Sequence, residues 1–156
     1  MATSPDFPRC MPAIPPDVRL DTGLMGLLGI EIVEATPARV VARMPVTAGH
    51  LQPFGYLHGG ASVALAETVA SVGGYLNAPE GAAAFGLEIN ANHVRSVRVG
   101  MLTAQGVPLH VGRTTQVWSV ELRDETEQLV CVSRCTLAVV DTTGRSQPEM
   151  EASAGL

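Results

Sequence analysis

One segment of the chain, His58–Leu76, has the length and composition of a long helix, and strand-like segments flank it on both sides. It ends before 77–81 (NAPEG), a run that stops helices. Gly29–Ala35 and Val40–Val46 precede it and alternate with the period of two that is typical of strands. Four further strand-like segments follow the helix: Ala84–Val97, Met101–Pro108, Gly112–Arg123 and Gln128–Val140.

Strands that follow one another without intervening helices favour antiparallel pairing. A single helix among so many strands must be covered by them. The sequence therefore predicts an α+β fold in which one curved antiparallel sheet wraps around one long central helix. A short helix is expected at Leu20–Leu28, where we interpret the G-x-x-G-x-x-G pattern as close helix packing, since no strand precedes it as a nucleotide loop requires.

The length of 156 residues corresponds to one domain. Residues 1–17 hold five of the eleven prolines and are expected to form an irregular N-terminal arm. Residues 142–156 are small and polar and are interpreted as a C-terminal tail. The folded domain is therefore predicted to span 18–141.

The charged residues exclude several classes of function. All ten positively charged residues are arginine, so Schiff-base, pyridoxal-phosphate and P-loop chemistry, which need lysine, are excluded. A net charge of −5 argues against nucleic-acid binding, which needs a basic excess. Charged residues make up only 16% of the chain, which favours an oligomer that buries further apolar surface over a monomer with a large core.

The cysteines and histidines indicate neither a disulfide framework nor a metal site. Cys131 and Cys135 lie four residues apart in a strand-like segment, about 13 Å apart at the strand rise, which is too far for a disulfide. The four histidines lack paired ligand spacing. Neither a signal peptide nor a membrane span is recognisable, so a reduced, cytoplasmic protein is expected.

Glu67 is the only charged residue between Gly59 and Leu76. Its neighbours three and four positions away are small, and only one of them carries a hydroxyl: Val63, Ala64, Ala70 and Ser71. This face could simply border water, but a solvated helix face usually carries several charges. A carboxylate in such surroundings suits a general base or a nucleophile.

His58-Gly59-Gly60 opens the same helix. The first N–H groups of a helix are unpaired and attract negative charge, so this start could form an oxyanion hole as well as a simple glycine-rich turn. With Glu67 about two turns further on, the pair could flank one reacting carbonyl, which points to acyl transfer or hydrolysis. Ser62 lies in a sequence that superficially resembles a nucleophile elbow. Such a site needs the chain order Ser, Asp, His, and no Asp lies between Asp21 and Asp124, whereas the last histidine is His110.

The motifs around the helix resemble the signature of hotdog-fold acyl-CoA thioesterases, in the branch of the 4-hydroxybenzoyl-CoA and phenylacetate-pathway enzymes: Gln52-Pro53-Phe54-Gly55, Leu57-His58-Gly59-Gly60-Ala61-Ser62 and Leu65-Ala66-Glu67. Residues 86–96 (GLEINANHVRS), with 108–110 (PLH) and 116–118 (QVW), resemble the members that act in menaquinone biosynthesis and in enterobactin proofreading. The likeness covers roughly 20–140.

The resemblance implies subunits that pair through their sheets, usually as a tetramer built from two dimers, with active sites at the dimer interface. It implies that Glu67 is the catalytic carboxylate and that the Gly59 N–H polarises the thioester carbonyl. Gln52 and His58 match residues that position the carbonyl and the water, and Ser71 matches a position that orients the water.

It also implies a set of acyl, pantetheine and CoA contacts: Gly86, His93, Val94, Arg95, Ser96, His110, Val111, Gly112, Arg113, Thr114 and Thr115. No cofactor is expected beyond CoA, which is part of the substrate. The expected reaction is hydrolysis of an acyl-CoA with an aromatic acyl group, such as 1,4-dihydroxy-2-naphthoyl or hydroxybenzoyl.

Other interpretations remain open at this point. The acyl group could be carried by a carrier protein instead of CoA, or the chain could bind acyl-CoA without turning it over. A hotdog hydratase would need an Asp followed five residues later by a His, which the chain lacks.

Overall fold

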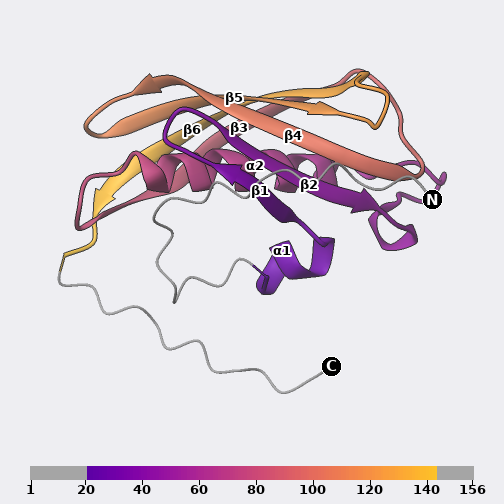
Figure 1. Ribbon diagram of the computed structural model, residues 1–156, viewed down its shortest axis with the longest axis horizontal. Helices are drawn as coiled ribbons and strands as arrows, with labels where there is room; N and C mark the ends of the chain where they lie inside the picture. Colours follow the sequence, from indigo (N-terminus) through magenta and orange to yellow (C-terminus); the bar gives the residue numbers. More distant parts are fainter. Residues whose placement is uncertain (1–20, 144–156) are drawn as a thin grey trace.

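A computed structural model describes residues 21–143 of the chain (Figure 1). The N-terminal arm 1–17 lies outside the described residues, and so does the C-terminal tail beyond residue 143. The elements follow in the order α1 (Gly23–Leu28), β1 (Glu31–Ala35), β2 (Val40–Val46), the 3-10 helix η1 (Ala48–His50), α2 (Gly59–Leu76), β3 (Ala82–His93), β4 (Gly100–Val111), β5 (Thr115–Arg123) and β6 (Leu129–Asp141).

The six strands form one antiparallel sheet in the order β1-β2-β4-β5-β6-β3. The sheet curves over α2, which lies along its concave side (Figure 1). This confirms the predicted α+β architecture. Strand β3 follows α2 in the chain but pairs with β6 at the far edge, so β1 and β3 are the two edges of the sheet.

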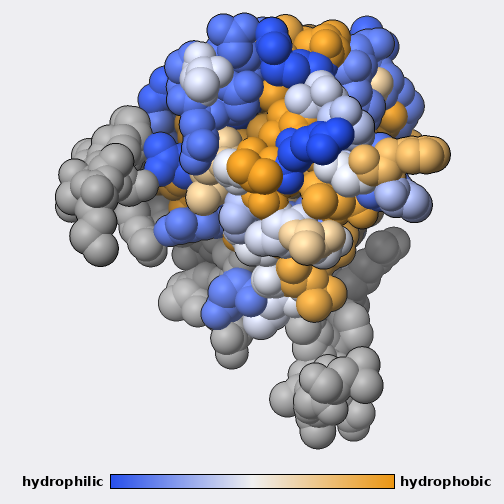
Figure 2. Space-filling model, turned by 90° about the vertical axis from the view of Figure 1, so that its right-hand side faces the viewer, coloured by the Kyte–Doolittle hydropathy of each residue, from blue (hydrophilic) through white to orange (hydrophobic). Residues whose placement is uncertain are grey.

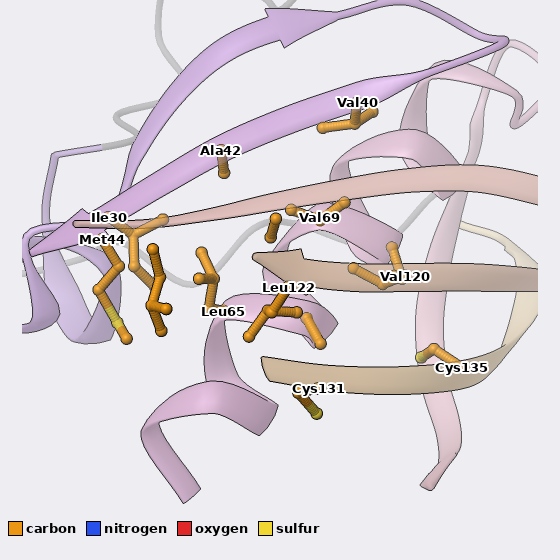
Figure 3. Packing of buried hydrophobic residues seen from close by; sticks show 14 of the residues in the cluster. Ile30, Val40, Ala42, Met44, Leu65, Val69, Val120, Leu122, Cys131 and Cys135 are labelled. Atoms are coloured by element: carbon orange, nitrogen blue, oxygen red, sulfur yellow. The ribbon is translucent and has the colours of Figure 1, made fainter. Parts of the chain in front are cut away.

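The core fills the space between α2 and the sheet. Residues of β2 alternate between buried and half-buried, as the period-two pattern of 40–46 predicts. Side chains from β2, α2, β5 and β6 point into this space (Figure 3), among them Val40, Ala42, Met44, Leu65, Val69, Val120, Leu122, Cys131 and Cys135.

The second half of α2 approaches the sheet closely. A β-carbon on Gly73 would overlap the ring of Trp118, so only glycine fits at that position. Gln116 is completely buried and donates from Nε2 to the carbonyl of Gly74, 3.1 Å away, while its Oε1 accepts from Nε1 of Trp118. These contacts fix the helix against the sheet.

The boundaries differ from the sequence prediction where the backbone turns. Gly29 caps α1 with a φ of 62°, so β1 begins at Glu31, two residues later than predicted. Gly23 also has a positive φ, of 59°, so Gly23 and Gly29 serve turns rather than close helix packing, whereas a β-carbon on Gly26 would overlap the carbonyl oxygen of Asp21. Val94 and Arg95 both donate to the carbonyl of Val130, which ends the β3 ladder at His93 rather than at residue 97.

Cys131 and Cys135 are free and buried, in agreement with the prediction that they form no disulfide. Within residues 21–143, no helix combines the length and apolarity needed to cross a bilayer.

Candidate active site

Helix α2 begins at Gly59 and is capped by the side chain of His58. Nδ1 of His58 accepts a hydrogen bond from the Gly60 N–H, 2.9 Å away. Because Nδ1 is the acceptor, the neutral ring carries its proton on Nε2. The Gly59 N–H has no acceptor among residues 21–143. This donor is therefore available to a ligand at the positive end of the helix dipole.

A pocket of about 420 Å³ opens beside this helix start, and we call it the helix-start pocket. Its walls are formed by Gln52, Tyr56, Leu57, Gly59, Ser62, His93, Val94, Arg95, Ser96, Val97 and Val130. The imidazole of His93 lies against Gly59, where a β-carbon would be 2.9 Å from Nε2. The structure thus brings Gln52, Gly59 and the run 93–96 together around one pocket.

Gln52 lies in a tight turn that leaves the N–H groups of its side-chain amide free. Its backbone N–H donates to the Tyr56 carbonyl, and its side-chain Oε1 accepts from the Phe54 N–H. The side-chain NH₂ has no acceptor in the described part of the chain. Gln52 can therefore donate to an oxygen in the helix-start pocket. His58 does not line this pocket but a neighbouring one of about 290 Å³, next to Leu24 and Leu28.

Glu67 and Ser71 line a separate pocket of about 300 Å³, which we call the mid-helix pocket. The remaining walls come from Leu24, Met25, Ala64, Thr68 and Val72. Glu67 is half-buried and forms neither a hydrogen bond nor an ion pair with any residue of the described range. Its Oε1 lies against Gly86 of β3. An unpaired carboxylate in a largely apolar pocket is suited to accept a proton or to attack a carbonyl.

The expectation that Gly59 and Glu67 flank one carbonyl is wrong for a single chain. Both residues lie on one face of α2, but eight residues apart, which is about 12 Å along the helix axis. They line different pockets. Strand β3 runs along this face in the opposite direction, with His93 at Gly59 and Gly86 at Glu67.

The expected CoA loop, 110–115, also lies apart from the helix-start pocket. It joins β4 to β5, and its turn is closed by the Gly112 N–H, which donates to the Thr115 carbonyl. The opposite end of β4, at Gly100, lies near the helix start, where Leu57 donates to the carbonyl of Val97. Within one chain, the loop and the run 93–96 are therefore at opposite ends of the sheet. Arg113 and Thr114 instead line a pocket of about 350 Å³ with Glu80, Gly81 and Asp141.

Two polar residues of the helix-start pocket, Tyr56 and Ser62, are not among the site residues that the sequence predicts. Tyr56 forms part of its wall, and the guanidinium of Arg98 stacks 4.1 Å from the centre of the Tyr56 ring. For Ser62 itself the sequence suggests only a resemblance to a nucleophile elbow and indicates no other role. Its spacing of three from Gly59 places both residues on one helix face, which is the signal that could have identified it.

The two described cysteines are poor nucleophiles. Burial and, to a smaller extent, the negative charges of Glu67 and Glu88 raise the pKa of the Cys135 thiol to about 11. Burial also raises the pKa of Cys131. Both thiols stay protonated at neutral pH. No group of three or more potential metal ligands occurs in residues 21–143.

Comparison with known proteins identifies the family. Residues 54–131 match the model of the thioesterase superfamily. A Bacillus subtilis protein that is named only as an esterase, ComA2, is 58% identical over 75% of this chain and 94% of its own length. A 1,4-dihydroxy-2-naphthoyl-CoA hydrolase from Listeria monocytogenes is 50% identical over 75% of this chain and 95% of its length.

The fold of the solved relatives agrees. The crystal structure of a thioesterase from Haemophilus influenzae superposes with a TM-score of 0.77 at 45% identity, covering 82% of this chain and 90% of that one. The curved sheet around one long helix is thus the hotdog fold that the motifs indicated. The chain belongs to the thioesterase superfamily and is a hotdog-fold thioester hydrolase.

Proposed function

We propose that the chain hydrolyses an aromatic acyl-CoA thioester, such as 1,4-dihydroxy-2-naphthoyl-CoA, to the free acid and CoA. Relatives from Listeria monocytogenes and Escherichia coli are named as hydrolases of that compound. A related thioesterase from Streptococcus pneumoniae, 25% identical, was crystallised with coenzyme A. One observation carries the proposal: the same face of α2 presents both a free N–H, at Gly59, and an unpartnered carboxylate, at Glu67.

The proposed reaction uses groups that these pockets offer. The Gly59 N–H and the helix dipole stabilise the oxyanion that forms at the thioester carbonyl, and the Gln52 amide holds the same carbonyl. Glu67 either takes a proton from the attacking water, which Ser71 orients, or attacks the carbonyl itself to form an anhydride that water then opens. In both cases the C–S bond breaks, the acid gains the oxygen of water and CoA leaves as a thiol.

Support for these roles comes from solved variants of a Staphylococcus aureus relative. In one a glutamate and in the other a glutamine was changed to alanine, and the two positions are fifteen residues apart. Gln52 and Glu67 have the same spacing.

The helix-start pocket with Gly59 and the mid-helix pocket with Glu67 each supply half of the proposed active site, and we call them the two half-sites. Their separation within one chain favours a dimer with shared active sites. Antiparallel pairing of β3 with β3 of a second copy would bring the Gly86 end of one chain beside the His93 end of the other. Glu67 of one subunit would then face the Gly59 N–H of its partner. The edge of β3 is free in the described chain and exposes Phe85 and Leu87, which are 51% and 65% exposed. Hydrophobic residues also lie exposed between hydrophilic ones on the face seen in Figure 2.

Mixing two inactive variants tests the shared site. Glu67→Gln and Gln52→Ala are purified separately, then unfolded, mixed and refolded together. If each site uses Glu67 from one subunit and Gln52 from the other, an equal mixture regains about a quarter of wild-type activity, because half the dimers contain one intact site. No recovery on mixing would place both residues in one subunit and contradict the proposal.

A panel of thioesters tests the substrate. Release of free thiol is measured with aromatic acyl-CoA, alkyl acyl-CoA and the same acyl groups on a carrier protein. We expect the highest kcat/KM for aromatic acyl-CoA. A preference for the carrier-protein thioester would overturn the assignment to CoA, and binding without turnover would mean a binding module.

A further inference from the structure

Ser62 is almost completely buried, at 1% exposed, and lies on the wall of the helix-start pocket. It follows Gly59 by three residues on α2, so its hydroxyl is on the same face about 4.5 Å further along the axis. Side chains on a helix lean towards its N-terminus. The hydroxyl therefore leans towards the free N–H of Gly59.

The hydroxyl of Ser62 stands out because it lacks a hydrogen-bond partner. Four polar residues in the described chain are buried: His50, Ser62, Gln116 and Ser133. The side chains of three of them are hydrogen-bonded: His50 to the Pro45 carbonyl, Gln116 to Gly74 and Trp118, and Ser133 to the Asn90 carbonyl. Ser62 makes no hydrogen bond with any residue of that range.

An unpartnered buried hydroxyl is costly, and native structures usually satisfy such groups with a ligand or water. Every side-chain oxygen or nitrogen of the described residues that is fully enclosed has a hydrogen-bond partner. Since the Ser62 hydroxyl has none, it is not fully enclosed and must border accessible space. The accessible space against Ser62 is the helix-start pocket. The Gly59 N–H, the Gln52 amide and Ser62 thus offer three donors to that pocket.

We propose that Ser62 donates a hydrogen bond to the thioester carbonyl oxygen, beside the Gly59 N–H, and so forms part of the oxyanion hole. This inference rests on the proposed function. Ser62 acts as a donor and not as the nucleophile, because no side chain of the described residues that could serve as a base is hydrogen-bonded to its hydroxyl. Its effect should increase as charge develops on the oxygen.

Binding of two non-hydrolysable CoA compounds tests this directly. In the first compound a methylene group separates the carbonyl carbon from the sulfur, so that the thioester becomes a ketone. The second compound is the corresponding thioether, which lacks the carbonyl oxygen. Ser62→Ala should weaken binding of the ketone about 2- to 10-fold, as expected for one neutral hydrogen bond, and leave the thioether unchanged. Equal effects on both compounds, or none, would overturn the proposal.

Turnover provides a second measurement. Ser62→Ala should lower kcat about 10- to 100-fold and raise KM by no more than the loss of ketone binding, because the donor acts mainly on the developing oxyanion. The thermal midpoint should not fall, since no partner of the hydroxyl is left unpaired. Ser119→Ala, the same change on β5 away from these pockets, is the matched control. If wild-type protein binds both compounds but releases no CoA, the proposed function fails while the binding comparison still decides the role of Ser62.

Discussion

The carboxylate of Glu67 lies against the backbone of Gly86, where a β-carbon would be 2.6 Å from Oε1. Gly86 belongs to the edge strand β3, whose register with β6 shifts between Gly86 and Glu88. Such a shift bends the strand locally. The missing side chain of Gly86 therefore gives the carboxylate the room to rest on the strand, and the sheet edge helps to set the position of Glu67.

Gly86→Ala should displace the carboxylate and lower kcat about 10- to 100-fold, because small misplacements of a reacting group are costly. KM should change much less. Steady-state kinetics with an aromatic acyl-CoA measures both. Gly49→Ala is a matched control, since a β-carbon there has only an ordinary contact, 3.9 Å from Oγ1 of Thr47.

A shorter acid tests the same contact from the other side. Glu67→Asp withdraws the carboxylate from residue 86, so the double variant Gly86→Ala, Glu67→Asp should lose less activity than the two single effects combined. Independent effects would mean that Gly86 does not position Glu67.

Glu67→Gln should lower kcat about 10²- to 10⁴-fold, because the amide neither accepts the proton of water nor forms an anhydride. The side chain keeps its length, so the variant should still bind the substrate. Isothermal titration with the CoA thioether checks binding, and release of free CoA checks turnover. A near-normal kcat would remove Glu67 from the mechanism.

Much of the fold could be predicted from local patterns. Residues 40–46 form β2 with the predicted bounds because the alternation there reflects one buried face. α2 begins one residue after the predicted start because His58 serves as its cap. These features depend only on residues that are close together in the sequence, so local patterns are enough to predict them.

The arrangement of the half-sites could not be predicted in this way. It depends on β3 crossing to the far edge beside β6, which places Gly86 at Glu67 and His93 at Gly59. No local pattern encodes that strand order. The motifs around α2 therefore suggest one site, whereas within one chain the fold places Gly59 in the helix-start pocket and Glu67 in the mid-helix pocket.

Cys135 should make stability depend on pH in alkaline solution. An ordinary thiol has a pKa of 9.0, and in the folded chain burial, with smaller effects of Glu67 and Glu88, raises the pKa of Cys135 to about 11. As the pH rises from 9 to 11, the unfolded chain loses this proton first, so the thiol's contribution to stability is complete below pH 9 and is lost across that window.

Thiolate absorbance against pH checks this in a chain with Cys10→Ser and Cys131→Ala. Adding Glu67→Gln should lower the pKa of Cys135, because one of the negative charges that raise it is gone. A folded chain whose Cys135 ionises at or below pH 9 would contradict the assignment.

Gly73→Ala should destabilise the fold, although alanine favours an isolated helix over glycine by about 1 kcal/mol. The added β-carbon would overlap the six-membered ring of Trp118, which is completely buried and held by its hydrogen bond to Gln116. Overpacking of this kind should lower the free energy of unfolding by about 1–3 kcal/mol in urea titrations. Trp118→Phe makes room near residue 73, so the double variant should lose less than the sum of the single losses. A more stable Gly73→Ala variant would show that helix propensity, rather than the contact with Trp118, decides the residue at this position.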